Sequence, residues 1–218
     1  MVDTARWIGA GAAAFAFTLP LAHLLAAWAA GRSPLAAPLL HLASASEAVS
    51  ALTGRLVWWL ALGMVLVQFA VILQRYVFGI GSIAMQEAII YMHGFLFLLA
   101  AGFTLMRDGH VRVDVLYRTA SPRRKAAINL LGTYLFLVPF MLLILSAAES
   151  FVAQSWRVLE GSKETSGIQG VFLLKSAIPA FAILMLVQGV AEAAKAALSL
   201  TGDPLPATEP AGADERPL

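Results

Sequence analysis

Residues 56–73 read LVWWLALGMVLVQFAVIL and decide the fold class of this chain. The run contains one polar side chain, Gln68, and no formal charge. At a rise of 1.5 Å per residue, about 20 apolar residues in a helix cross the hydrocarbon core of a bilayer. The run is close to that length, so it predicts a transmembrane helix.

Three further runs meet the same standard, and Lys175, near the end of the last one, is the sole formal charge in them. They are Ala88–Met106, Ile128–Ala148 and Val171–Ala191. A fifth candidate, Trp7–Ala30, is rich in alanine and free of formal charge. We therefore expect an all-α integral membrane protein with four core transmembrane helices plus an extra N-terminal transmembrane helix.

Composition supports this class and excludes others. Hydrophobic residues make up 60% of the 218 residues and charged residues 13%, against roughly 45–50% and about 25% in soluble proteins. A small globule leaves too much surface exposed to hide so many apolar residues from water. The absence of cysteine excludes disulfide scaffolds, cysteine-ligated metals and thiol catalysis. Little sequence remains outside the spans for a soluble catalytic domain, so we expect no enzyme activity.

The basic residues predict the orientation. Six of the 15 Lys and Arg residues lie in residues 107–127, which the positive-inside rule places in the cytoplasm. Alternation of five spans then puts ten basic residues inside and five outside, with the N-terminus outside and the C-terminus inside. Because these charges are topological, we expect no nucleic-acid partner. The first segment could instead be a cleaved signal peptide, but residues 31–55 would then lie outside and break the charge pattern.

The chain is expected to divide into four parts. Residues 1–30 form the N-terminal transmembrane segment, and residues 56–195 form the four-helix membrane domain. In residues 31–55, apolar side chains recur at helical spacing at Leu39, Leu42, Val49, Leu52 and Leu56, which predicts an amphipathic linker helix at the inner interface. A disordered Ala/Ser linker is the alternative. Residues 196–218 are expected to be a disordered cytoplasmic tail.

The predicted spans lack the chemistry of a stand-alone carrier. Solute pathways are usually marked by acids, bases or paired broken helices at mid-depth, and the charges here lie at span ends. No two of the four histidines, His23, His41, His93 and His110, lie at equal depth on facing spans, as a haem with two axial imidazoles would require. For His93 we expect a helix–helix hydrogen bond. His110 and Asp114 are two ligands without a third, so we expect no metal and no cofactor.

Three polar clusters remain, each typical by itself of a solvated helix end. The first follows the run at residues 56–73, the second lies on the inner side, and the third follows the third long span. Their members are Arg75, Gln86 and Glu87; His110, Arg112 and Asp114; and Trp156, Glu160 and Lys175.

In this order, the clusters resemble one family. The chain resembles the small membrane subunit, the DctQ-like subunit, of tripartite ATP-independent periplasmic (TRAP) transporters, over residues 56–195. The matching residues are Arg75-Tyr76-Val77-Phe78-Gly79, Gln86-Glu87, Tyr91-Met92-His93, Ala101-Gly102-Phe103-Thr104-Leu105, His110-Val111-Arg112-Val113-Asp114, Ser155-Trp156, Glu160, Lys175 and Gln188.

The resemblance implies a complex in the bacterial inner membrane, in contact with membrane lipids. Its partners would be a large, DctM-like permease that moves as an elevator and a DctP-like periplasmic solute-binding protein. The small subunit would brace the large one during ion-gradient-driven uptake of a small organic solute, a carboxylate, with no catalytic residues of its own. The family usually has four spans, and this chain adds a fifth. Two other functions stay open from the residues alone: a haem- or redox-anchoring membrane subunit, and a stand-alone carrier.

Overall fold

The structure, a computed structural model, describes residues 2–31, 33–111 and 117–204, and every regular element among them is a helix. The elements are α1 (Val2–Ala30), α2 (Ala36–Val77), α3 (Ile83–Leu99), α4 (Ala101–Met106), α6 (Pro122–Gly132), η1 (Thr133–Leu137), α7 (Val138–Arg157) and α8 (Val171–Thr201). This confirms the all-α expectation.

Within the described residues, four helical segments are long and apolar enough to cross a membrane, as predicted. They are Ala36–Val77, Ile83–Met106, Pro122–Arg157 and Val171–Thr201. In α1 the stretch Phe15–Ala30 is a shorter apolar helix. That α1 crosses the membrane stays a prediction.

The expected boundary between a linker and the first core span, after residue 55, is not a break in the structure, because α2 continues through it. This helix runs unbroken for 42 residues and joins most of the expected linker to the first core span. Its buried residues continue at spacings of three and four across that point: Leu39, Ala43, Ser46, Ser50, Gly54 and Val57. That residues 31–55 lie at the inner interface stays a prediction. Of the predicted apolar face, Leu39 is buried against the bundle, whereas Leu52 and Leu56 are exposed and can contact lipid. Small side chains are buried instead because they allow a close approach of the neighbouring helix.

That neighbour is α8, which lies at the centre of the bundle and contacts every other described helix. Its last three turns carry a buried row of small residues: Ala191, Ala193, Ala194, Ala196 and Ala197. α8 also continues through residues 196–201, which were expected to belong to a disordered tail. It ends at Gly202, whose φ of 79° is a left-handed conformation that glycine adopts without strain.

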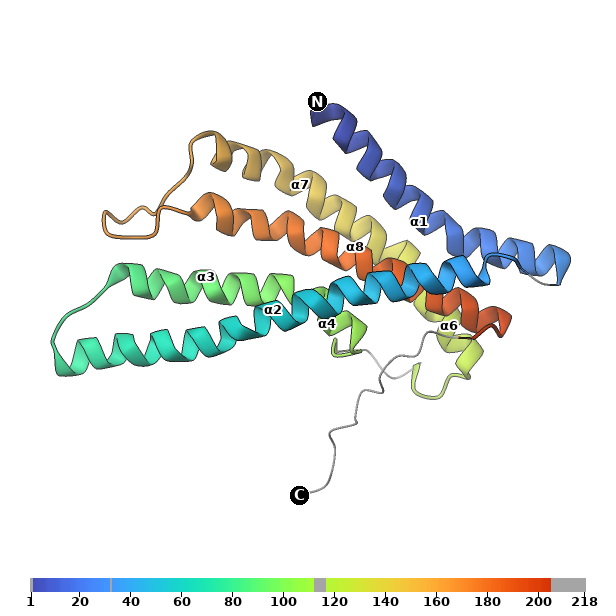
Figure 1. The fold of residues 1–218 in the computed structure, drawn as a ribbon, viewed down its shortest axis with the longest axis horizontal. Coiled ribbons are helices and arrows are strands. Elements are labelled where there is room, and N and C mark those ends of the chain that lie inside the picture. Colours follow the sequence, from blue (N-terminus) through green and yellow to red (C-terminus); the bar gives the residue numbers. More distant parts are fainter. Residues whose placement is uncertain (1, 32, 112–116, 205–218) are drawn as a thin grey trace, which may run out of the picture.

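The helices lie roughly along one long axis, with the connections gathered at two ends (Figure 1). The turn from α2 to α3 and the loop from α7 to α8 lie at one end, and α1 meets the start of α2 and the end of α8 at the other. By the predicted orientation these are the outer and the inner end, and they are called so below.

α6 and α7 are joined by η1, a π-helical turn in which the Val138 N–H donates to the Thr133 carbonyl oxygen. Pro139 follows directly. Proline has no N–H to donate and its ring collides with the carbonyl four residues earlier, so the regular α-helical hydrogen-bond pattern is disturbed at this point. The wider π turn accommodates both effects.

Candidate functional site

At the outer end, Glu87 in the first turns of α3 holds the loop between α7 and α8. Its carboxylate accepts hydrogen bonds from the Ser162 hydroxyl and, at 2.6 Å, from the backbone N–H of Ile168. The Tyr91 hydroxyl, one turn further along α3, donates to the Ile168 carbonyl oxygen at 3.4 Å. The start of α3 is thus attached to a loop that is far away in sequence.

Lys175, near the start of α8, forms an ion pair with Glu160 at the beginning of the same loop. The ammonium nitrogen lies 2.5 Å from a carboxylate oxygen of Glu160 and 4.0 Å from the centre of the Phe151 ring. The hydrogen bond from Lys175 lowers the pKa of Glu160 from its ordinary value of 4.5. The backbone N–H of Phe172 also donates to the Glu160 carbonyl oxygen at 3.2 Å.

Trp156 completes this outer cluster. Its indole N–H donates to the Ser176 hydroxyl at 2.8 Å, and its ring meets the Phe172 ring edge-on with 4.7 Å between the centres. The structure therefore brings Glu87, Trp156, Glu160 and Lys175 together at the outer end. It does not bring in the other two members of the first cluster, because Arg75 and Gln86 are exposed and both oxygens of Glu87 are bonded to the loop.

His93 lies on an outward-facing side of α3. Its ring stacks on the Phe97 ring at 6.2 Å and an interplanar angle of 10°. His93 is exposed, as are Ile90 (61%) and Phe97 (72%) on the same face. The next residue, Gly94, lies on the side of α3 that faces α8, because a Cβ added to it would lie 2.8 Å from Leu174. The expected helix–helix hydrogen bond of His93 is thus not formed within the described part of the chain.

The inner cluster is described only in part. His110 is exposed, whereas Arg112 and Asp114 lie outside the described residues.

A buried polar network joins α2 and α8 near the inner end, and the sequence interpretation missed it. The Ser50 hydroxyl donates to Gln188 at 2.8 Å, and the Gln188 amide donates to Glu192 at 3.1 Å. Lys195 pairs with Glu192 at 2.7 Å and with Glu47 at 2.8 Å. The i, i+4 and i, i+3 spacing of the three α8 residues was a signal for one polar face. It was overlooked because Glu192 and Lys195 were placed at or beyond the end of the span.

His23 attaches α1 to the inner end of α8. The ring is fully buried, and its Nε2 lies 3.0 Å from the Thr201 hydroxyl oxygen and 3.2 Å from an Asp203 carboxylate oxygen. The other three histidines are exposed and lie on α2, on α3 and after α4. Across the described residues, no three His, Asp or Glu side chains are grouped as metal ligands would be.

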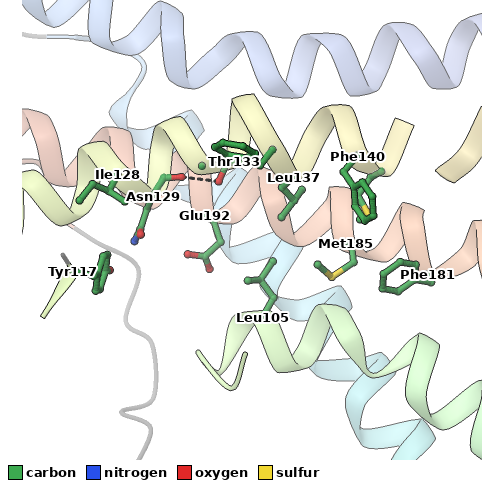
Figure 2. Close-up of a pocket in the computed structure, with 13 residues that line it drawn as sticks. Leu105, Tyr117, Ile128, Asn129, Thr133, Leu137, Phe140, Phe181, Met185 and Glu192 are labelled. Atoms are coloured by element: carbon green, nitrogen blue, oxygen red, sulfur yellow. Dashed lines mark hydrogen bonds between the residues drawn. The ribbon is translucent and has the colours of Figure 1, made fainter. Parts of the chain in front are cut away.

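An open groove of about 940 Å³ lies between α4, α8 and the α6–η1–α7 segment. Its walls are apolar along most of their length, and Asn129, Thr133 and Glu192 add polar groups (Figure 2).

Comparison with known families identifies the scaffold that carries these features. Residues 64–198 match the family described as tripartite ATP-independent periplasmic transporters, DctQ component. The match covers more than half of the chain. The chain belongs to the DctQ family. Searches of curated proteins and of solved structures found no match.

DctQ membership makes this chain the small permease subunit of a TRAP transporter, a component that works with partner subunits. Together with the four long apolar helices, it establishes a multi-pass membrane protein. The match starts within α2 and ends near the end of α8, so α1 lies outside it. Glu47 and Ser50 also precede the match, although they bond to Lys195 and Gln188 inside it.

Proposed function

We propose that this DctQ subunit braces a large, DctM-like permease in the bacterial inner membrane. The large subunit would move as an elevator and carry the solute and ion sites. A DctP-like periplasmic protein would deliver the solute, a small organic molecule with a carboxylate group. Uptake would be driven by an ion gradient. Family membership supports the complex, and the structure supports the bracing role through one exposed helix face.

The observation that carries this proposal is the exposure of His93 on α3. His93 lies six residues after Glu87, whose carboxylate belongs to the polar outer end, so His93 is about 9 Å below that end and within a hydrocarbon core of about 30 Å. A polar ring facing lipid at that depth is unfavourable, and ionisable residues in spans almost always face protein or water. A partner helix that covers Ile90, His93 and Phe97 would remove that cost.

The polar groups of the interior support a static role as well. Gln188, Glu192 and Lys195 bond to one another and to α2, so they are not free to replace the hydration shell of a solute. The outer loop is held by Glu87, and α8 contacts every other described helix. A bundle joined at both ends in this way is suited to support a moving partner.

Photo-cross-linking tests the proposed face. A benzoylphenylalanine at position 93, in this chain co-expressed with the large permease of the same transporter, should cross-link to that permease. The same probe at Phe69 of α2, which is 65% exposed, is the matched control and should cross-link less. Equal cross-linking at the two positions, or none at position 93, would contradict the assignment of this face.

Transport assays test the function itself. Liposomes that contain this chain alone should show no sodium-driven uptake of carboxylates, and deletion of the chain should abolish uptake by the complete system. The double variant of the face, His93→Leu with Phe97→Ala, should lower uptake and co-purification of the large permease together. Uptake by the isolated chain, or full uptake without it, would overturn the proposal.

A further inference from the structure

The open groove between α4, α8 and the α6–η1–α7 segment is lined mostly by apolar side chains (Figure 2). Its volume is about 940 Å³. Phe140, Met141, Phe181 and Met185 line the part toward the outer end, and Leu105 of α4 forms the opposite wall. Toward the inner end the lining becomes polar, with Asn129, Thr133, Tyr117 and Glu192.

One wall of the groove has no side chain at Gly132. Gly132 lines the groove at the end of α6, and a Cβ added to it would meet no atom within 4 Å. The π turn begins at the next residue, Thr133, whose hydroxyl donates to the Asn129 carbonyl oxygen at 2.9 Å. Because this hydroxyl already donates to a backbone carbonyl of the same helix, a molecule in the groove does not need to accept a hydrogen bond from it.

The inner end of the groove is bordered by positive charge. Arg124 and Lys125 precede the groove residues Ile128 and Asn129 by four positions on α6, so each lies one turn away on the same face. The Lys125 ammonium nitrogen lies 5.2 Å from the centre of the ring of Tyr117, itself a lining residue. Arg118 and Arg123, both exposed, lie next to these residues in the chain.

The acidic lining residue, Glu192, does not cancel this charge. One of its carboxylate oxygens lies 2.7 Å from the Lys195 ammonium nitrogen and accepts a hydrogen bond from the Gln188 amide at 3.1 Å. Lys195 is shared with Glu47, so these three side chains together carry one net negative charge, which lies on the α8 side of the groove. The cations of α6 stand on the opposite wall and are available to an anion.

We propose that this groove binds an anionic phospholipid from the cytoplasmic leaflet. Its acyl chains would lie along Phe140, Phe181, Met185 and Leu105, and its phosphate would lie beside Arg124 and Lys125. Basic pockets between spanning helices on the cytoplasmic side are suited to anionic headgroups. A partner helix, about 10–12 Å across, would cover the apolar part, whereas a phospholipid supplies both acyl chains for that part and a phosphate for the cations. The proposal requires membrane insertion in the predicted orientation and is independent of the bracing role.

Two pairs of variants test the headgroup contact and the acyl-chain contact separately. Arg124→Gln with Lys125→Gln removes the charge, and Arg75→Gln with Arg157→Gln removes the same charge from exposed positions near the outer end as a control. Gly132→Leu places an apolar side chain in the groove, and its Cβ would meet no atom within 4 Å. Gly132→Ala is its control, because it gives the same gain in helix propensity with little added volume.

The measurement is lipid binding to the full chain in detergent by native mass spectrometry. Phosphatidylglycerol and phosphatidylcholine with identical acyl chains are the probes. We expect tighter binding of phosphatidylglycerol, a loss of about tenfold in that affinity in the Arg124/Lys125 variant, and no change in the control charge variant. Gly132→Leu should abolish tight binding of both lipids, and Gly132→Ala should preserve it. Circular dichroism and thermal melting establish that each variant is folded.

Three results would overturn the proposal. The first is equal affinity of the wild type for the two lipids, which leaves no role for the cations. The second is unchanged phosphatidylglycerol binding in the folded Gly132→Leu variant. The third is a loss of large-permease co-purification in that variant while lipid binding stays intact, which would assign the groove to a partner helix instead.

Discussion

The Glu87 carboxylate accepts a hydrogen bond at 2.6 Å from the backbone N–H of Ile168, which lies 81 residues further along the chain. Ile168 belongs to the loop between α7 and α8, and its carbonyl oxygen also accepts a hydrogen bond from Tyr91. Two residues one turn apart on α3 thus bind both the backbone N–H and the carbonyl oxygen of Ile168. The outer end of the bundle is held by this contact as well as by helix packing.

Glu87→Gln should loosen the outer loop. Hydrogen bonds to a charged group contribute about 1.5–3 kcal/mol, more than neutral ones, and an amide cannot accept at both atoms. We expect a loss of about 2 kcal/mol in the unfolding free energy and faster hydrogen exchange at residues 162–168. Glu164→Gln, which removes the same charge from an exposed side chain of that loop, is the control and should have little effect. Equal effects of the two substitutions would contradict the role of Glu87.

The pair of Lys175 and Glu160 predicts a dependence on pH. The hydrogen bond from Lys175 lowers the pKa of Glu160 from 4.5. A carboxyl whose pKa is lowered by folding adds stability above its ordinary pKa and loses it as the pH falls through the folded value. The loop contact should therefore persist at neutral pH and weaken below about pH 4.5.

Lys175→Met tests this pair directly. In a ¹³C NMR titration of labelled glutamate carboxyls, the substitution should raise the pKa of Glu160 toward its ordinary value. Lys163→Met is the comparison, because the charge of Lys163 makes the smallest contribution to lowering the pKa of Glu160. A shift in Lys163→Met as large as that in Lys175→Met would show that general positive charge, and not the hydrogen bond, lowers the pKa.

Gly54→Ala should separate α2 from α4. A Cβ at this position would lie 2.4 Å from the Phe103 ring and 2.9 Å from the Phe103 Cβ. Overpacking costs about 1–3 kcal/mol, which exceeds the gain in helix propensity of about 1 kcal/mol. We expect a net loss of stability in SDS-induced unfolding. Gly132→Ala, where the space is open, should cause no loss, and a loss in both variants would contradict the packing argument.

The buried pair of Ser50 and Gln188 predicts non-additive substitutions. Both side chains are fully buried, and the Ser50 hydroxyl donates to Gln188 at 2.8 Å. Gln188→Leu leaves that donor without its acceptor and should cost about 1 kcal/mol or more. Adding Ser50→Ala should recover part of the loss, since both polar groups are then gone. Additive losses in the double-mutant cycle would show that the pair is not coupled.

The orientation is testable because the chain has no native cysteine. Ser166 in the α7–α8 loop and Thr119 before α6 are exposed. A membrane-impermeant maleimide applied to intact spheroplasts should label Ser166→Cys and leave Thr119→Cys unlabelled until the membrane is opened. The reverse pattern would invert the predicted topology.

The sequence by itself determined which segments are helical and which of them can span a membrane. In a bilayer each backbone N–H and C=O must be satisfied within its own segment, so an uninterrupted apolar run has to become a helix. That is why residues 56–73 and 171–191 were identified from composition alone. The family was also recognisable, because its polar residues recur in a fixed order along the chain.

The tertiary structure alone decided how the faces of these helices are used. Helical spacing shows that Leu52 and Leu56 share a face with Val49, but in a membrane apolar side chains can face lipid as well as protein, and the buried side of α2 is the one with small residues. In the same way, Glu87 and Ile168 meet across 81 residues only because α3 and α8 lie side by side. Exposure of His93 likewise depends on which side of α3 faces α8. Hydrophobicity fixes the segments in a bilayer, whereas close packing and the satisfaction of buried polar groups select the neighbours.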